Sequence, residues 1–78
     1  MWRMTRRRTF AKCLSECRQA ACLSQEQLAD KAGLRRTCIS QLERGLKGPA
    51  LEVLAALAEP MDMSFKSFWA QLARRLGP

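Results

Sequence analysis

One stretch of this 78-residue chain, residues 24–44, constrains its fold more than any other part. It contains two short segments with helical periodicity, separated by Gly33. Glycine adopts the left-handed conformation that ends many helices at little cost. Ser24 precedes the first segment and Gln27 follows three residues later, which is the spacing of a capping box. The stretch therefore predicts two short helices joined by a tight turn.

Helical periodicity also recurs on both sides of this stretch. Thr9 is placed to cap a first helix, Ser64 to begin a last one, and Pro60 to end the helix between them. We expect five helices, at residues 9–21, 24–33, 34–44, 50–59 and from 64 onward. The apolar residues expected to face inward are Phe10, Leu14, Cys17, Ala21, Leu28, Ala29, Ile39, Leu42, Leu51, Leu54, Leu57, Phe65, Phe68, Leu72 and Leu76. No alternating run indicates a strand, so the predicted fold class is all-α.

The first eight residues are basic and lack apolar periodicity. We expect residues 1–8 to be a flexible arm and residues 9–78 to be a single domain. Two interpretations of the arm stay open. It reaches along a DNA groove, as basic arms do in several folds, or it is a disordered tail that adds only non-specific attraction. No pattern in residues 1–8 indicates a defined structure, which favours the disordered tail.

The net charge of +7 suits a polyanionic partner, either nucleic acid or an anionic membrane surface. No apolar run approaches the roughly 18 residues of a membrane span, and no secretory signal follows the basic N-terminus. We therefore expect a cytoplasmic protein. An enzyme is not expected, because the chain has no histidine and no nucleophile beside a base. We also expect no cofactor and no small-molecule ligand.

The four cysteines, Cys13, Cys17, Cys22 and Cys38, fit no common zinc spacing, so no metal site is expected. Cytosolic thiols stay reduced, which argues against a structural disulfide. The spacing of Cys13 and Cys17 places both on one helix face, where reduced cysteine acts as a small hydrophobe.

The residues of the central stretch resemble the lambda-repressor-like, or Cro/C1-type (XRE), helix-turn-helix family. Gln25, Ala29, Gly33, Ile39 and Glu43 stand at the spacing of that family, and the similarity covers roughly residues 10–69. More narrowly, the compact chain resembles the small controller proteins of restriction–modification systems. The resemblance implies a compact five-helix domain that binds double-stranded DNA and regulates transcription.

In this family the second helix of the motif enters the major groove, which is about as wide as a helix. The resemblance assigns base reading to Arg36, Thr37 and Gln41. Arg36 can make a bidentate contact to guanine. The resemblance assigns phosphates or the groove edge to Gln25, Arg35, Ser40, Arg44 and Lys47. Without the motif, the same arginines are typical of a solvated helix face.

The resemblance also implies a structural ion pair between Arg18 and Glu43, joining the first helix to the end of the third. Four positions depart from the family pattern. Cys38 stands where Ser, Thr or Tyr often faces the DNA backbone. Cys22 and Asp62 stand where glycine is common, and Ala50 replaces a Ser/Thr helix cap. A left-handed cysteine or a missing cap each costs on the order of 1 kcal/mol.

One helix in the major groove contacts only about four to six base pairs, which is too few to specify a site in a genome. We therefore expect a two-fold dimer on a palindromic operator. The half-sites are expected about 34 Å apart. The expected interface is Phe65, Phe68, Trp69 and Leu72. The alternative is that Phe68 and Leu72 close the core of one copy instead.

The expected function is thus a sequence-specific transcriptional regulator that binds DNA as a homodimer. One alternative is an antitoxin, or another protein-interaction module of a toxin–antitoxin system, that also binds its own promoter. Another is an amphipathic membrane-surface peptide, suggested by the charge and by Trp2 and Trp69.

Overall fold

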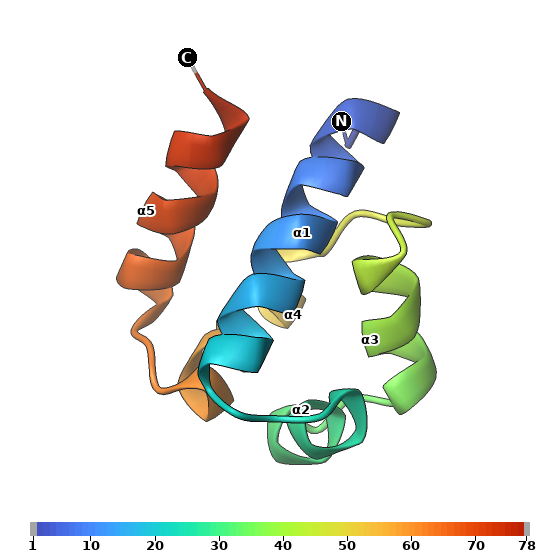
Figure 1. The fold of residues 1–78 in the computed structure, drawn as a ribbon, viewed down its shortest axis with the longest axis vertical. Helices are drawn as coiled ribbons and strands as arrows, with labels where there is room; N and C mark the ends of the chain where they lie inside the picture. Colours follow the sequence, from blue (N-terminus) through green and yellow to red (C-terminus); the bar gives the residue numbers. More distant parts are fainter. Residues whose placement is uncertain (1, 78) are drawn as a thin grey trace.

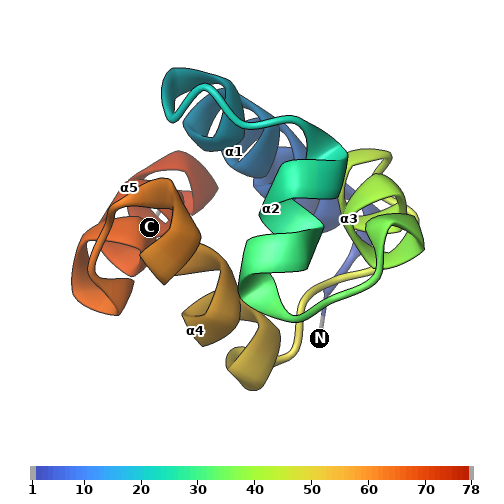
Figure 2. The same ribbon diagram turned by 90° about the horizontal axis from the view of Figure 1, so that it is seen from below.

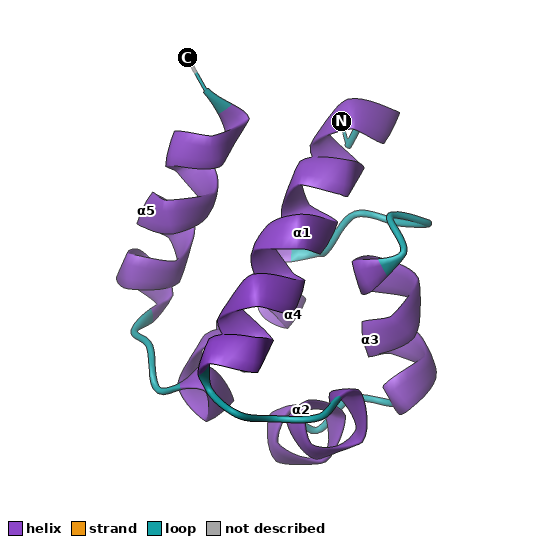
Figure 3. Ribbon diagram, in the orientation of Figure 1, coloured by secondary structure: helices purple, strands orange, loops and turns teal. Residues whose placement is uncertain are grey.

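Residues 2–77, the part of the chain that this computed structural model describes, form five α-helices, one short 3₁₀ turn and the loops that join them (Figure 1). The elements are α1 (Met4–Ala20), α2 (Gln25–Ala32), α3 (Arg36–Glu43), α4 (Leu51–Ala58), η1 (Glu59–Met61) and α5 (Phe65–Leu76). Residues 2–77 contain no strand (Figure 3), so the predicted all-α fold with five helices is confirmed. None of these helices combines the length and the apolar character needed to cross a bilayer.

Helix α1 runs through the middle of the molecule, with α3 against one side and α5 against the other (Figure 1). Helix α2 crosses beneath α1, and the view from below shows α4 between α2 and α5 (Figure 2). The arrangement leaves α3 at one flank of the molecule, where its outer face is open to a partner.

The core lies where these helices meet, and every one of them contributes to it. The rings of Phe10 on α1 and Phe68 on α5 lie 6.3 Å apart, centroid to centroid. Both side chains are fully buried. The buried cluster consists of Phe10, Cys13, Leu14, Leu28, Ala29, Ile39, Leu42, Leu54, Leu57, Ala58, Met61, Phe68 and Leu72. Leu51 and Phe65 are exceptions among the residues expected inside, because they are 68% and 39% exposed.

The start and the end of α2 follow from local sequence signals. The Ser24 hydroxyl accepts a hydrogen bond from the Gln27 backbone N–H at 3.0 Å, and Gln27 Oε1 accepts one from the Ser24 backbone N–H at 2.8 Å. The predicted capping box is therefore present. Gly33 ends the helix with a φ of 70°, in the left-handed region that glycine adopts without strain.

The first helix begins earlier than the sequence predicts. Thr9 is not a cap: α1 starts at Met4, and the Thr9 hydroxyl donates to the Thr5 carbonyl one turn back at 3.0 Å. Residues 4–8 are thus the first turns of a helix, and the expected boundary after Arg8 does not exist in the fold. Arginine is a good helix former, and nothing before Thr9 interrupts a helix.

Three expected local irregularities are present. Cys22 and Asp62 both have a φ of 59°, so each non-glycine residue occupies the left-handed region. Ala50 is the N-cap of α4 and offers no side-chain hydrogen bond to the helix. Pro60 follows the last residue of α4 closely, and the chain continues through it as the 3₁₀ turn η1.

Candidate nucleic-acid interface

Helix α3 has a buried side and an exposed side, and the predicted DNA-contacting residues lie on the exposed one. Ile39 and Leu42 are fully buried and anchor the helix to the core. The exposed or half-buried predicted residues are Arg35, Arg36, Thr37, Ser40, Gln41, Arg44 and Lys47. Anchoring through two buried residues fixes the rotation of α3 about its axis, so the polar face points outward.

Two shallow hollows lie side by side on this exposed face. Arg36, Ser40 and Arg44 line the first, together with Leu46 of the following loop. Arg35, Cys38 and Lys47 line the second. Thr37 and Gln41, one helical turn apart, line both hollows and form the ridge between them. The structure therefore brings together all the predicted DNA-contacting residues of α3 and its loop.

The charge of this face has one sign. Between Lys31 and Leu51 the sequence contains a single acidic residue, Glu43. Its carboxylate accepts hydrogen bonds from Arg18 and is only 7% exposed. The exposed charges on α3 and its loop are therefore the cations of Arg35, Arg36, Arg44 and Lys47. Such a surface attracts a polyanion without local repulsion.

The predicted ion pair between Arg18 and Glu43 is present and is mostly buried. Arg18 Nε donates to Glu43 Oε2 at 2.6 Å, and Arg18 Nη2 donates to Glu43 Oε1 at 3.1 Å. A third bond runs from Arg18 Nη1 to the Leu23 carbonyl at 2.7 Å. The guanidinium thus joins α1 to the end of α3 and to the segment before α2.

Gln25 lies apart from the two hollows. It occupies the first position of α2, and its amide nitrogen donates to Glu43 Oε1 at 3.2 Å. The sequence did not indicate this bond. It holds the start of α2 against the end of α3, so the residue expected to contact a phosphate also orients the two helices of the motif.

The first turns of α1 cover the loop between α3 and α4, which sequence reasoning missed. Arg7 Nη1 donates to the Leu46 carbonyl at 3.0 Å. Trp2 packs edge-on against Phe10, with ring centroids 5.8 Å apart. The available signal was that Met4 and Arg6 to Arg8 are good helix formers and that neither glycine nor proline precedes Thr9.

The predicted dimer residues divide into two pairs. Phe68 and Leu72 are fully buried within this chain, so they offer no surface to a second copy. Their predicted place in a dimer interface is therefore wrong, because both side chains pack in the core of this chain. Phe65 and Trp69 remain accessible, 39% and 45% exposed respectively.

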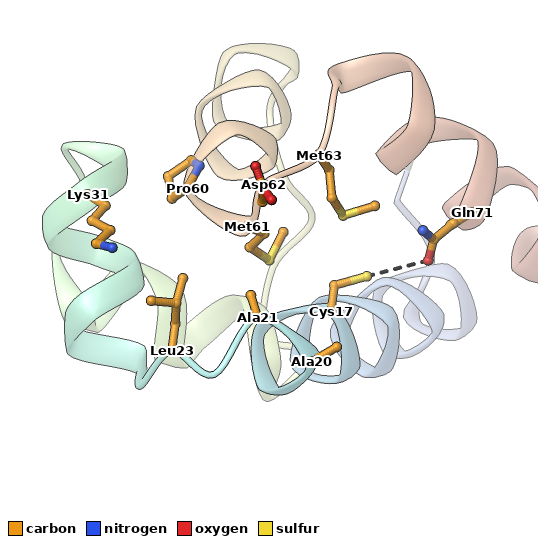
Figure 4. A pocket seen from close by; sticks show the side chains of 10 residues that line it. All are labelled: Cys17, Ala20, Ala21, Leu23, Lys31, Pro60, Met61, Asp62, Met63 and Gln71. Carbon is orange, nitrogen blue, oxygen red and sulfur yellow. Dashed lines mark hydrogen bonds between the residues drawn. The ribbon is translucent and has the colours of Figure 1, made fainter.

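A larger hollow of about 490 Å³ lies between the end of α1, α2, η1 and α5 (Figure 4). Met61, Met63 and Cys17 line it, and the Cys17 thiol donates to Gln71 Oε1 at 3.6 Å. It contains none of the residues predicted to contact DNA. All four cysteines are free thiols in the structure.

Known proteins share the helix-turn-helix motif described above. The sequence pattern of the helix-turn-helix family HTH_3 matches residues 14–68. An uncharacterized HTH-type transcriptional regulator of Mycobacterium tuberculosis, MT0491, is 38% identical over 47 residues, which are 60% of this chain and 34% of that protein. The chain thus spans about a third of the length of the curated relatives it matches.

Solved structures show the same fold. The restriction-modification controller protein C.AhdI of Aeromonas hydrophila is 34% identical, with a TM-score of 0.74, over 80% of this chain and 94% of that one. The wild-type controller protein C.Esp1396I, at 24% identity, has a TM-score of 0.81 over 91% of this chain and 92% of that one. The chain therefore belongs to the HTH_3, or XRE-type, helix-turn-helix family.

Proposed function

We propose that this chain binds a palindromic site on double-stranded DNA as a homodimer and reads the major groove with α3. The observation that carries the proposal is the exposed face of α3. It combines cations with hydrogen-bonding side chains and carries no exposed carboxylate. Base edges and phosphates are recognised by these side-chain types.

The proposed roles follow from position on that face. Arg36, Thr37 and Gln41 read bases: Thr37 and Gln41 form its central ridge, and Arg36 can bond guanine at two atoms. Phosphate contacts are assigned to Gln25, Arg35, Ser40, Arg44 and Lys47. Gln25 retains its carbonyl oxygen and the second hydrogen of its amide nitrogen for other partners, since only one donor is committed to Glu43.

A dimer through α5 fits the exposed apolar surface there. Phe65 and Trp69 are four residues apart on one helix, so their side chains are neighbours on its surface. In a two-fold dimer through this surface, the two α3 helices would enter successive major grooves, about 34 Å apart.

We further propose that the chain is a regulator of the restriction–modification controller type. Its 34% identity over 94% of C.AhdI supports this narrower assignment. A regulator that binds bacterial or phage promoters works in the cytoplasm, where that DNA lies.

Selection from a random duplex library tests the proposal directly. Purified protein is expected to enrich an inverted repeat whose half-site centres are about 10 base pairs, or one turn, apart. Enrichment of an isolated half-site would contradict binding as a dimer but not base recognition by α3. No enrichment of any sequence would contradict sequence-specific recognition.

A further inference from the structure

Trp2 and the first turns of α1 contact the loop that follows α3 at three places. Arg7 bonds to Leu46, as described above. The side chain of Arg8 lies against Gly45, since a methyl group built on that glycine would be 3.5 Å from Arg8 Cγ. Trp2 lies over Gly48, where a built methyl group would be 2.2 Å from Trp2 Cγ. We call residues 2–8 the N-terminal strap.

The strap holds the peptide unit that leads into Lys47. The Leu46 carbonyl, which accepts from Arg7, belongs to the peptide bond between Leu46 and Lys47. The Leu46 backbone N–H donates to the Gln41 carbonyl on α3 at 3.0 Å. Leu46 is thus bonded on one side to the reading helix and on the other to α1, which fixes the direction in which the Lys47 side chain leaves the loop.

The residue after Lys47 is fixed by contact with Trp2. Gly48 has no left-handed φ, so backbone conformation does not explain the glycine. Its environment does, because any Cβ at this position would overlap the indole. Lys47 is exposed, yet its backbone is restrained on both sides by the strap.

We propose that Arg7 and Trp2 are positioning residues for DNA binding, which act by holding Lys47 in the orientation that meets a phosphate. The proposal rests on the proposed function of α3 and its loop. It assigns the basic N-terminus a role inside the domain rather than as a mobile tail or a groove-binding arm. Without this restraint, the Lys47 side chain is no longer directed at the phosphate, so the contact itself is lost.

The salt dependence of DNA affinity tests Arg7. Each phosphate contact contributes about 1 to the slope of log affinity against log salt. Lys47→Ala is expected to reduce the slope by about 1 per bound copy. Arg7→Met keeps the apolar stem and removes the bond to Leu46. It should lower the slope by a similar amount, about 1. In the double variant the reduction should remain about 1, because both changes remove the same contact.

Arg74→Met is the matched control, since it removes one exposed arginine charge from α5, across α1 from α3. It should leave the slope unchanged. An unchanged slope in Arg7→Met would overturn the proposal, because Arg7 would then act only in folding. A reduction of about 2 per copy in the double variant would also overturn it, since Arg7 would then contact a phosphate itself.

Gly48→Ala tests Trp2 without altering any charge. The added methyl must displace the indole, so the slope is expected to fall as in Lys47→Ala, with no further change when the two are combined. Ser67→Ala, which changes one small exposed side chain on α5 and no charge, is the control. An unchanged slope in Gly48→Ala would contradict the role of Trp2. The proposed function itself is judged separately, by library selection and by Arg36→Ala.

Discussion

Arg18 on α1 holds both carboxylate oxygens of Glu43 at the end of α3, at 2.6 and 3.1 Å. The two side chains are only 13% and 7% exposed. Glu43 is also the partner of Gln25 at the start of α2. One buried carboxylate therefore fixes the mutual orientation of the three helices that present the candidate DNA-binding face.

Removing one partner of this pair is expected to destabilise the protein strongly. Arg18→Met leaves the Glu43 carboxylate buried without its counter-ion and should lower the free energy of unfolding by about 3–5 kcal/mol. The double variant Arg18→Met with Glu43→Met should lose less than Arg18→Met alone, because no unpaired charge remains. Urea unfolding followed by circular dichroism measures the free energy of unfolding of each variant. A double variant that loses the sum of the two single losses would contradict this account.

The exposed pair of Glu16 and Arg75 provides the comparison for that experiment. It also joins two helices, α1 and α5, but its side chains are 37% (Arg75) and 46% (Glu16) exposed. Water screens such a pair, so Arg75→Met should reduce stability far less than Arg18→Met.

Replacing Cys22 by glycine is expected to stabilise the protein. Cys22 has a φ of 59°, which costs a non-glycine residue on the order of 1 kcal/mol. Cys22→Gly should therefore raise the melting temperature, whereas Cys22→Ala should not. Asp62→Gly should bring a smaller gain, because aspartate tolerates this conformation better. Equal melting temperatures for Cys22→Gly and Cys22→Ala in a calorimeter would show that the position is not strained.

The buried thiol of Cys13 predicts a loss of stability at alkaline pH. Burial, reinforced by the neighbouring Cys17, raises the pKa of Cys13 from 9.0 to about 11. The unfolded thiol therefore ionises first. The contribution of Cys13 to stability is complete below pH 9 and is lost as the pH rises toward 11.

Urea unfolding at about pH 8 and about pH 10.5 isolates this effect when the wild type is compared with Cys13→Ala. The wild type should lose more stability between the two pH values than the variant. Equal losses would mean that the ionisation of Cys13 is not linked to folding.

Dimer formation through α5 is expected to depend on Trp69. Trp69→Ser removes apolar surface that is 45% exposed in one copy, so it should weaken self-association while leaving the fold intact. Leu51→Ser removes a side chain that is 68% exposed on α4 and serves as the control. Sedimentation equilibrium gives the dissociation constants. If the Trp69→Ser protein associates as tightly as the wild type, this surface of α5 is not the dimer interface.

The features predictable from the sequence are those that local chemistry determines. Ser24 with Gln27, and Gly33, fix both ends of α2 through contacts within a few residues. The start of α1 was missed because it carries no cap, and its first turns are held by Trp2 and Arg7 against distant residues.

The same limit applies to the candidate site. The sequence pattern places Arg36, Thr37 and Gln41 on one helix face, and Ile39 and Leu42 on the other. It cannot show that Gln25 bonds to Glu43, or that α1 rather than a second copy covers Phe68. Those facts depend on how helices far apart in the sequence pack together.

The most direct test of the central claim is the affinity of the selected duplex for Arg36→Ala and Gln41→Ala, measured beside Arg74→Ala at one salt concentration. Loss of a base-reading side chain should cost about 1–3 kcal/mol on the selected duplex and much less on a scrambled duplex. Arg74→Ala should bind both duplexes like the wild type. If Arg36→Ala and Gln41→Ala keep the full preference for the selected sequence, α3 is not the reading helix.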